Sequence, residues 1–248
     1  MMDLDRVNNY LARVEESEKT TFKPVGSRLK VGVDLGTAYI VLVVLDEENN
    51  PVACEKQAAQ VLRDGVVVDY TGARQIVKDL KEKLEERLGT ELVNCAIAMP
   101  AGTESSVKTH QYVAEGAGLE VTNILDEPSA ANAIYQIEDG VVVDIGGGTT
   151  GLAILKEGKV VQIEDEPTGG THLTLVLSGN YHVSFEEAEA IKQDYKPEEL
   201  VGKKIIVIAN LKPHRITGVT SQGSMTASYR MLAVPKSRPD CCMPRLSY

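Results

Sequence analysis

Two stretches of sequence decide the fold: Lys30-Val31-Gly32-Val33-Asp34-Leu35-Gly36-Thr37 and Gly140-Val141-Val142-Val143-Asp144-Ile145-Gly146-Gly147-Gly148-Thr149-Thr150. Each begins with a valine-rich run typical of a buried β-strand and continues into an aspartate and a glycine-containing turn. Further strand-like runs follow, at residues 39–45 and 52–54 in the first copy and at 151–155 and 159–164 in the second. The aspartates are 110 residues apart. The sequence therefore predicts the same β-meander twice.

The two turns have the composition of phosphate-binding loops. Glycines let backbone amides come close to phosphate oxygens, and threonine hydroxyl groups can donate to the same oxygens. Carboxylates at strand ends, here Asp34 and Asp144, can hold Mg²⁺ through water. One such turn is more often only a turn, but its duplication in a matching context favours two hairpins that hold one nucleotide. The predicted phosphate contacts are Gly36, Thr37, Gly146, Gly147, Gly148, Thr149 and Thr150.

A third element lies between the two copies. The run Asp126-Glu127-Pro128-Ser129-Ala130-Ala131 predicts the start of a helix, because proline is welcome in a first helical turn. Glu127 has two interpretations: a favourable negative charge at a helix N-terminus, or a group that positions an attacking water. Beside Asp34 and Asp144 we favour the second. Glu127, Asp144 and Asp34 are thus the predicted catalytic residues.

The remaining sequence alternates between helix and strand patterns, which predicts a mixed α/β fold. Helices are expected at 3–17, at 104–117, from 128 onward, and from Ser184 to about 193, where Ser184 and Glu187 have the spacing of a capping box. A strand at 66–70 should lead into a helix that ends at Gly89, and strands should follow at 93–99 and 121–125. The first helix either packs on its own domain or docks a partner.

Composition narrows the classes of protein. The 248 residues are 43% hydrophobic, enough for one large domain or two smaller ones. No run approaches the roughly 20 apolar residues of a membrane span, and the N-terminus lacks a signal peptide's apolar centre. We therefore expect a cytoplasmic protein with no membrane partner. The net charge of −10 makes a nucleic-acid partner unlikely, and the four cysteines lack metal-ligand spacing, so no zinc site is expected.

At its two loops and at 127–131 the chain resembles the actin/DnaK ATPase superfamily. Within that superfamily it is most similar to the ethanolamine-utilisation EutJ family over about residues 28–194, on Val31–Thr37, Val61–Val66, Leu125–Ala130, Val143–Gly151 and Ser184–Ala190. The resemblance implies an actin/DnaK-like (ribonuclease-H-like) fold and the cofactors ATP and Mg²⁺. It also implies a chaperone or assembly role with ethanolamine-utilisation enzymes or with shell proteins of a bacterial microcompartment.

Two departures from the family pattern shape the expectations. Only about 40 residues separate Cys54 from Cys95, too few for the insertion that carries a catalytic lysine in DnaK. If ATP is hydrolysed, we therefore expect a slow, Mg-dependent reaction. The second copy is also followed by too few residues to repeat the first. We predict a complete first half and a truncated second half that exposes a sheet edge.

The last quarter of the chain has a different composition. Residues 1–200 carry a net charge of −17, whereas residues 201–248 carry +7. Residues 195–223 resemble part of the C-terminal tRNA-binding OB module of methionyl-tRNA synthetase, and 224–248 have no periodicity and are predicted to be disordered. We hypothesise a chimeric chain, made by natural rearrangement or by an assembly or frame error. The predicted domains are 1–28 (helix and linker), 29–139, 140–194, 195–223 and 224–248.

Two alternative functions remain open. A sugar or metabolite kinase shares the Asp-x-Gly-Thr loop, although its additional carboxylate base and larger second domain are not evident in this sequence. A tRNA-binding fusion protein would rest on residues 195–223 alone, which supply too few strands for a closed five-stranded barrel.

Overall fold

The structure is a computed structural model that describes residues 4–63, 65–100, 104–192, 214–216 and 219–221. The chain divides into units of residues 1–188 and 189–248. In the second unit, β11 (His214–Ile216) and β12 (Val219–Ser221) form an antiparallel pair. Most of the predicted 195–223 module and the whole predicted tail lie outside the described residues.

A five-stranded sheet forms the centre of the first unit. Its strands, in spatial order, are β3 (Pro51–Ala58), β2 (Tyr39–Leu45), β1 (Lys30–Leu35), β6 (Asn94–Met99) and β7 (Glu120–Asp126). Strands β1, β2 and β3 are antiparallel neighbours, as expected of a meander, whereas β1, β6 and β7 run parallel. Parallel neighbours need crossover connections, and α2 (Tyr70–Leu88) and α3 (Glu104–Gly116) lie in those connections. Consequently β1, β6 and β7 all end at one edge of the sheet.

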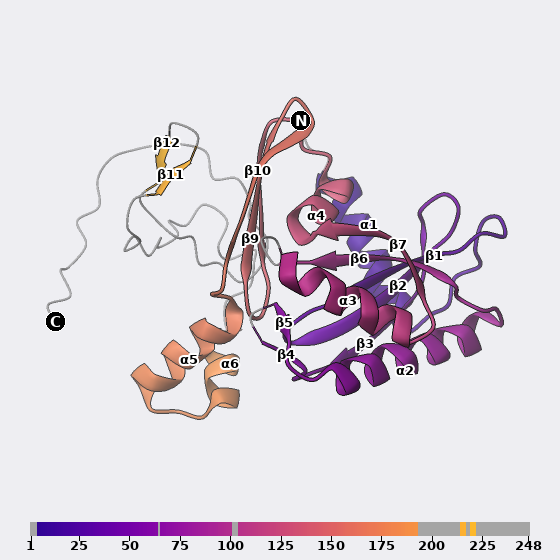
Figure 1. Cartoon of the computed structure of the whole chain (residues 1–248), viewed down its shortest axis with the longest axis horizontal. Coiled ribbons are helices and arrows are strands. Elements are labelled where there is room, and N and C mark those ends of the chain that lie inside the picture. Colours follow the sequence, from indigo (N-terminus) through magenta and orange to yellow (C-terminus); the bar gives the residue numbers. More distant parts are fainter. Residues whose placement is uncertain (1–3, 64, 101–103, 193–213, 217–218, 222–248) are drawn as a thin grey trace, which may run out of the picture. The chain divides into compact units, whose positions relative to one another are not determined.

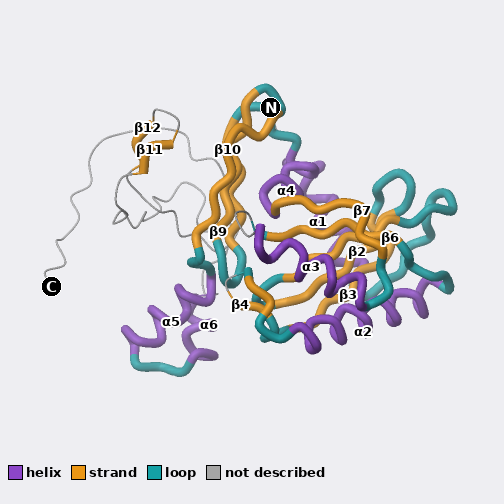
Figure 2. Tube along the Cα trace, viewed as in Figure 1, coloured by secondary structure: helices purple, strands orange, loops and turns teal. Residues whose placement is uncertain are grey.

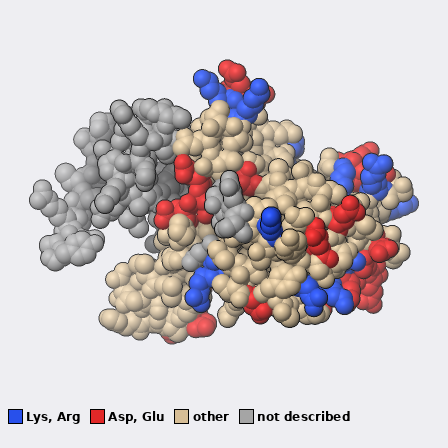
Figure 3. Space-filling view, in the orientation of Figure 1, with Lys and Arg blue, Asp and Glu red and all other residues tan. Residues whose placement is uncertain are grey.

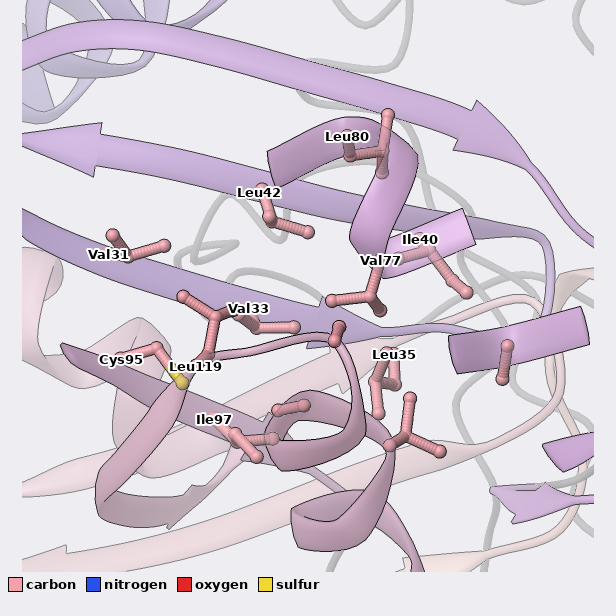
Figure 4. Close-up of a cluster of buried hydrophobic side chains, with 14 of the residues drawn as sticks. Val31, Val33, Leu35, Ile40, Leu42, Val77, Leu80, Cys95, Ile97 and Leu119 are labelled. Carbon is pink, nitrogen blue, oxygen red and sulfur yellow. The ribbon is translucent and has the colours of Figure 1, made fainter. Parts of the chain in front are cut away.

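The hydrophobic core lies on one face of this sheet. Every second residue of β1 is buried, namely Val31, Val33 and Leu35, and these side chains belong to one cluster with Val77 and Leu80 of α2 (Figure 4). Full burial of such a side chain stabilises the fold by about 1.5–3 kcal/mol. This packing fixes the direction of β1 and, with it, the place of the loop that follows.

Helix α1 (Leu4–Ser17) covers part of the opposite face, on which α4 (Glu127–Tyr135) also lies (Figure 1). Val7 is buried, the Arg13 Nε donates to the Pro51 carbonyl at 3.2 Å, and the Phe22 amide donates to the Val52 carbonyl at 2.8 Å. The helix thus packs on its own domain, which decides between the two predicted alternatives. The segment after it pairs with the edge strand β3 and blocks further strand addition there.

The second predicted meander is also present. Strands β8 (Gly140–Ile145), β9 (Thr150–Lys156) and β10 (Lys159–Glu166) form an antiparallel sheet in the order β10-β9-β8 (Figure 2). Its small core consists of Val142, Ala153 and Leu155, against which Ala131 and Tyr135 of α4 pack. Among the described residues this sheet has only three strands, so β8 and β10 each have a neighbouring strand on one side only. The exposed edge stays a prediction.

Some local predictions were wrong. The predicted strand 66–70 is a short hairpin of β4 (Leu62–Arg63) and β5 (Val66–Val67). Tyr70 already belongs to α2, because the Asp69 carboxylate caps that helix by accepting from the Gly72 amide at 2.9 Å.

The predicted capping box of α6 (Phe185–Lys192) is confirmed. The Glu187 amide donates to Ser184 Oγ at 3.1 Å, and the Ser184 amide donates to Glu187 Oε2 at 2.9 Å.

Helix α5 (Gly170–Tyr181) was not predicted. Its sequence contains glycines and β-branched residues, which are poor helix formers, and its N-cap residue Gly169 has no side-chain oxygen to offer. Leu175, Val176 and Tyr181 are exposed on it, and the face in view shows almost no charge at this helix (Figure 3). None of the helices among the described residues is long and apolar enough to cross a membrane.

Helix α3 buries a histidine, and this predicts how stability depends on pH. His110 is fully buried, its Nδ1 lies 2.9 Å from the Ser106 carbonyl, and its Nε2 has no partner among the described residues. Burial lowers the pKa of His110 below 6.5. At this site the unfolded chain therefore binds an additional proton as the pH falls below 6.5, so His110 makes a contribution to the free energy of unfolding that becomes unfavourable there.

We expect the free energy of unfolding of His110→Leu, relative to that of wild type, to increase as the pH falls from 7.5 to 5, measured by urea unfolding at each pH. His182→Asn is the matched control, because His182 is exposed in a left-handed conformation that asparagine tolerates. An unchanged slope in His110→Leu would assign the pH dependence to other groups.

Candidate functional site

A cleft of about 410 Å³ opens where β1, β6 and β7 end and where the turn after β8 approaches them. This volume is within the range of ligand pockets. It also lies at the carboxyl ends of parallel strands, where α/β proteins commonly bind ligands. The cleft is lined by Asp34, Gly36, Thr37, Glu127, Asp144, Gly146, Gly147, Gly148 and Thr149, all of which were predicted. The two meanders thus bring their turns to one place.

The two glycine loops touch each other. A Cβ atom at Gly148 would lie 2.5 Å from Thr37 Oγ1 and 3.1 Å from both Thr37 Cβ and Cγ2, so the threonine would have to rotate and the two loops would have to move slightly apart. At Gly147 it would lie 3.1 Å from the Ala38 Cβ. Glycine is required here by the close approach of the loops. The lack of side chains lets a ligand come close to the loop backbone, which is what phosphate binding needs.

The start of α5 holds the second loop in place. The amide of Gly170 donates to the Gly146 carbonyl at 2.8 Å, and the amide of Thr171 donates to the Gly147 carbonyl at 2.9 Å. A Cβ atom at Gly169 would lie 2.5 Å from the Gly146 oxygen and 2.7 Å from the Gly147 carbonyl carbon. The backbones can approach this closely only because residue 169 has no side chain. This contact makes α5 part of the site although it does not line the cleft.

Glu127 lies at the first position of α4. The Asp126 carboxylate caps this helix by accepting from the Ser129 amide at 2.8 Å, and Pro128 is in the first turn, as predicted. Glu127 is only partly accessible. Burial, together with the nearby charges of Asp34, Asp144, Asp165 and Asp126, raises its pKa to about 8. Near pH 7 this carboxyl group is therefore largely protonated in the ligand-free protein.

The other carboxylates of the cluster are affected in the same way. Asp34 opens into the cleft, but surrounding protein limits its hydration, and this together with the charge of Asp144 raises its pKa to about 6. Burial also raises the pKa of Asp144. Closely spaced carboxylates repel one another, and this repulsion favours either protonation of one of them or binding of a cation between them.

Asp165 of β10 belongs to the same cluster and was not predicted. Burial and the charges of Asp144 and Glu166 raise its pKa to about 7, although a hydrogen bond from Thr149 acts in the opposite direction. Its Oδ1 is buried without a partner among the described residues. Asp165 pairs with Gly151 across β9 and β10, so the register of the second meander places this carboxylate beside the loop. No glycine turn marks it in the sequence.

The comparisons with known proteins agree with this geometry. The profile of a family described as MreB/Mbl protein matches residues 52–196, more than half of the chain. EutJ of Escherichia coli (strain K12) is 45% identical over 172 residues, which are 69% of this chain and 61% of the relative. The crystal structure of EutJ from Carboxydothermus hydrogenoformans is 50% identical, has a TM-score of 0.70, and is matched over 76% of this chain and 70% of that chain.

The chain belongs to the EutJ family.

The fold extends beyond EutJ. MreB5 of Spiroplasma citri, solved bound to ADP, has a TM-score of 0.53 at 20% identity over 79% of this chain and 70% of that chain, which shows a common fold. The predicted actin/DnaK-like α/β class is thus confirmed. The chain spans 61% of the length of the Escherichia coli EutJ. The resemblance of residues 195–223 to a tRNA-binding module stays a prediction.

One of the predicted phosphate contacts, Thr150, differs in the structure of this chain. Thr150 does not line the cleft, because it is the first residue of β9 and its hydroxyl group donates to the Thr168 carbonyl at 2.7 Å. Conversely, Lys56, Gly65 and Pro100 line the cleft without having been predicted. In the sequence, Gly65 was marked only by its place in the EutJ-like run 61–66, and nothing there indicated that it lines the cleft. Lys56 had no signal, since nothing in the local sequence relates β3 to the loops.

Proposed function

We propose that this EutJ-family chain binds Mg–ATP with the polyphosphate between its two glycine loops. The observation that carries the proposal is the contact between the loops, which brings Gly148 against Thr37 beside a cluster of carboxylates. The amides of Gly36, Gly147 and Gly148, with the hydroxyl group of Thr37, would hold the phosphates. The Gly146 amide donates to the Thr149 carbonyl at 2.9 Å and the Thr149 hydroxyl group donates to Asp165, so neither is assigned to phosphate. Thr150 is left out, because its hydroxyl group is engaged elsewhere.

The residues present fit a hydrated divalent cation. Among the described residues, no group of three or more His, Cys, Asp or Glu side chains is arranged to ligate a metal directly. Asp34 and Asp144 are nevertheless close enough to raise the pKa of Asp34. We therefore propose that Asp34 and Asp144 hold Mg²⁺ through its water ligands, the manner in which Mg²⁺ commonly binds proteins. The bound ion would neutralise phosphate charge and relieve the repulsion among the carboxylates.

Glu127 is suited to orient a water near the terminal phosphate, because it begins α4 at the cleft. With the cation bound, its ionised form becomes less unfavourable, and it can accept a hydrogen bond from that water. A carboxylate in this position orients the water but is a weak base toward it. We therefore expect slow ATP hydrolysis at most.

We further propose that the biological role is that of the family. Nucleotide binding would serve a chaperone or assembly function in ethanolamine utilisation, in the cytoplasm, with enzymes or shell proteins of its microcompartment as partners. The domain limits proposed for this role are 29–139 for the half that bears the first loop and 140–194 for the part that bears the second.

Calorimetric titration of the chain with Mg–ATP, with Mg–tripolyphosphate and with ATP in EDTA tests the proposal. We expect the two magnesium complexes to bind and EDTA to abolish binding. Asp144→Asn should weaken Mg–ATP binding at least about tenfold, or ~1.4 kcal/mol, whereas the exposed Glu86→Gln on α2 should have no effect. A folded wild-type chain that binds neither magnesium complex would exclude the proposed function.

The kinase alternative predicts a different result. Small hydroxylated metabolites should then raise the rate of ADP formation in a coupled assay, whereas the proposed function predicts a slow rate that no such metabolite changes. A metabolite-dependent increase of about tenfold or more would favour the kinase.

A further inference from the structure

Lys56 of β3 lies in the same cross-strand row as Asp34. It pairs with Val41 of β2, which in turn pairs with Asp34 of β1, so the three side chains are on one face of the sheet. Two strand spacings, about 10 Å, separate the backbones of Lys56 and Asp34. Val41 and Lys56 both line the cleft, and Lys56 is the only lysine or arginine among the described residues that does so. The sheet thus directs one positive charge toward a cleft that is otherwise acidic.

The ammonium group of Lys56 is paired with an anion. Its Nζ lies 2.7 Å from Glu18 Oε1, and the two side chains remain 47% and 27% exposed. An ion pair that is this accessible to water contributes little to stability and is easily exchanged. A polyphosphate in the cleft carries more negative charge than one carboxylate and offers several acceptor oxygens. It can therefore compete with Glu18 for Lys56.

The backbone next to Glu18 is held in place by hydrogen bonds from Arg87. The guanidinium of Arg87, at the end of α2, donates to the Ser17 carbonyl at 2.8 Å, to the Cys54 carbonyl at 2.9 Å and to Glu55 Oε1 at 2.6 Å. Arg87 thereby ties the end of α1 to β3, next to Lys56. The backbone next to Glu18 is thereby held against β3, and its partly exposed side chain contacts Lys56, which lines the cleft.

We propose that the Glu18–Lys56 ion pair is a phosphate-sensitive link between the N-terminal helix and the nucleotide cleft. This inference rests on the proposed function. The terminal phosphate of the nucleotide takes Lys56 from Glu18, so Lys56 adds affinity and Glu18 reduces it. Because the link responds to the outermost phosphate, the triphosphate gains more from Lys56 than the diphosphate does. Loss of the pair on binding then frees one of the contacts that hold the end of α1.

Titration of four folded chains tests the link: wild type, Lys56→Gln, Glu18→Gln and the double variant. We expect Lys56→Gln to weaken Mg–ATP binding about tenfold and Mg–ADP binding less. Glu18→Gln should strengthen Mg–ATP binding about threefold, and this gain should vanish when Lys56 is also changed. Glu16→Gln and Lys19→Gln are matched controls, since both side chains are exposed neighbours on the same segment. Lys56→Arg should keep most of the affinity because it preserves the charge.

The outcomes separate the two proposals. A folded wild-type chain that fails to bind Mg–ATP overturns the proposed function, and the link with it. Wild-type binding that Lys56→Gln leaves unchanged overturns the link alone, as does an equal gain from Glu18→Gln with and without Lys56. Equal losses for ATP and ADP in Lys56→Gln overturn the assignment to the terminal phosphate.

Discussion

Gly169→Ala should lower Mg–ATP affinity by roughly 10–100-fold while the five-stranded sheet stays folded. The new Cβ would lie 2.5 Å from the Gly146 oxygen and 2.7 Å from the carbonyl carbon and oxygen of Gly147. These are backbone atoms, so the contact is relieved only if the loop and the start of α5 move apart, which breaks the hydrogen bonds that hold the loop. Such a movement displaces the amides that are proposed to bind phosphate. Calorimetric titration measures the affinity, and thermal unfolding followed by circular dichroism measures the fold.

Gly179→Ala is the matched control in the same helix. A Cβ atom at Gly179 meets nothing within 4 Å, and alanine is the better helix former, so stability should stay equal or increase by up to about 1 kcal/mol. Nucleotide affinity should not change. Equal affinities of Gly169→Ala and wild type would show that the α5 contact does not position the loop.

Asp165→Asn should stabilise the protein in EDTA and at the same time weaken its binding of Mg–ATP. Asp165 crowds Asp144, and its pKa of about 7 shows that its ionised form is disfavoured in the folded state. Removing that charge should increase the free energy of unfolding at pH 8 by about 1 kcal/mol, after allowance for partial exposure to water. For a domain of this size the midpoint of thermal unfolding should rise by about 2–4 °C. The loss of a carboxylate near the cation should reduce Mg–ATP affinity several-fold.

The pH dependence gives this prediction its sign. A carboxyl group whose pKa is raised on folding destabilises the folded state once it ionises, so the cost appears as the pH rises from 3.8 to about 7. The stability advantage of Asp165→Asn should therefore be absent near pH 4 and complete above pH 7. Glu86→Gln removes an exposed carboxylate on α2 and is the matched control for the loss of one negative charge. If Asp165→Asn is less stable than wild type at pH 8, the carboxylates of the cluster do not repel one another.

Much of the site followed from local sequence. Alternating valines before Asp34 and Asp144 predicted strands, and the glycines after them predicted turns that can approach phosphate. The duplicated pattern then required two equivalent meanders. The start of α4 at Glu127 was also recognisable, because capping and first-turn proline are properties of a few adjacent residues. The mixed α/β class followed from the alternation of helix and strand patterns.

Other members of the site could not be recognised in this way. Helix α5 forms against the propensity of its own residues, and tertiary contacts of this kind commonly override propensity. The importance of Gly169 depends on a backbone that is distant in the sequence, that of Gly146 and Gly147. Thr150 has the right residue type for phosphate, but the register of β9 gives its hydroxyl group to Thr168.

By itself the sequence determined the two meanders, their glycine loops and the aspartates that precede them, because a strand and the turn after it are set by neighbouring residues. Only the tertiary structure decided that Asp165 joins the carboxylate cluster and that Lys56 lines the cleft while it pairs with Glu18. Both depend on strand register, which is fixed by packing across the sheet. A shift of one residue would turn either side chain to the other face.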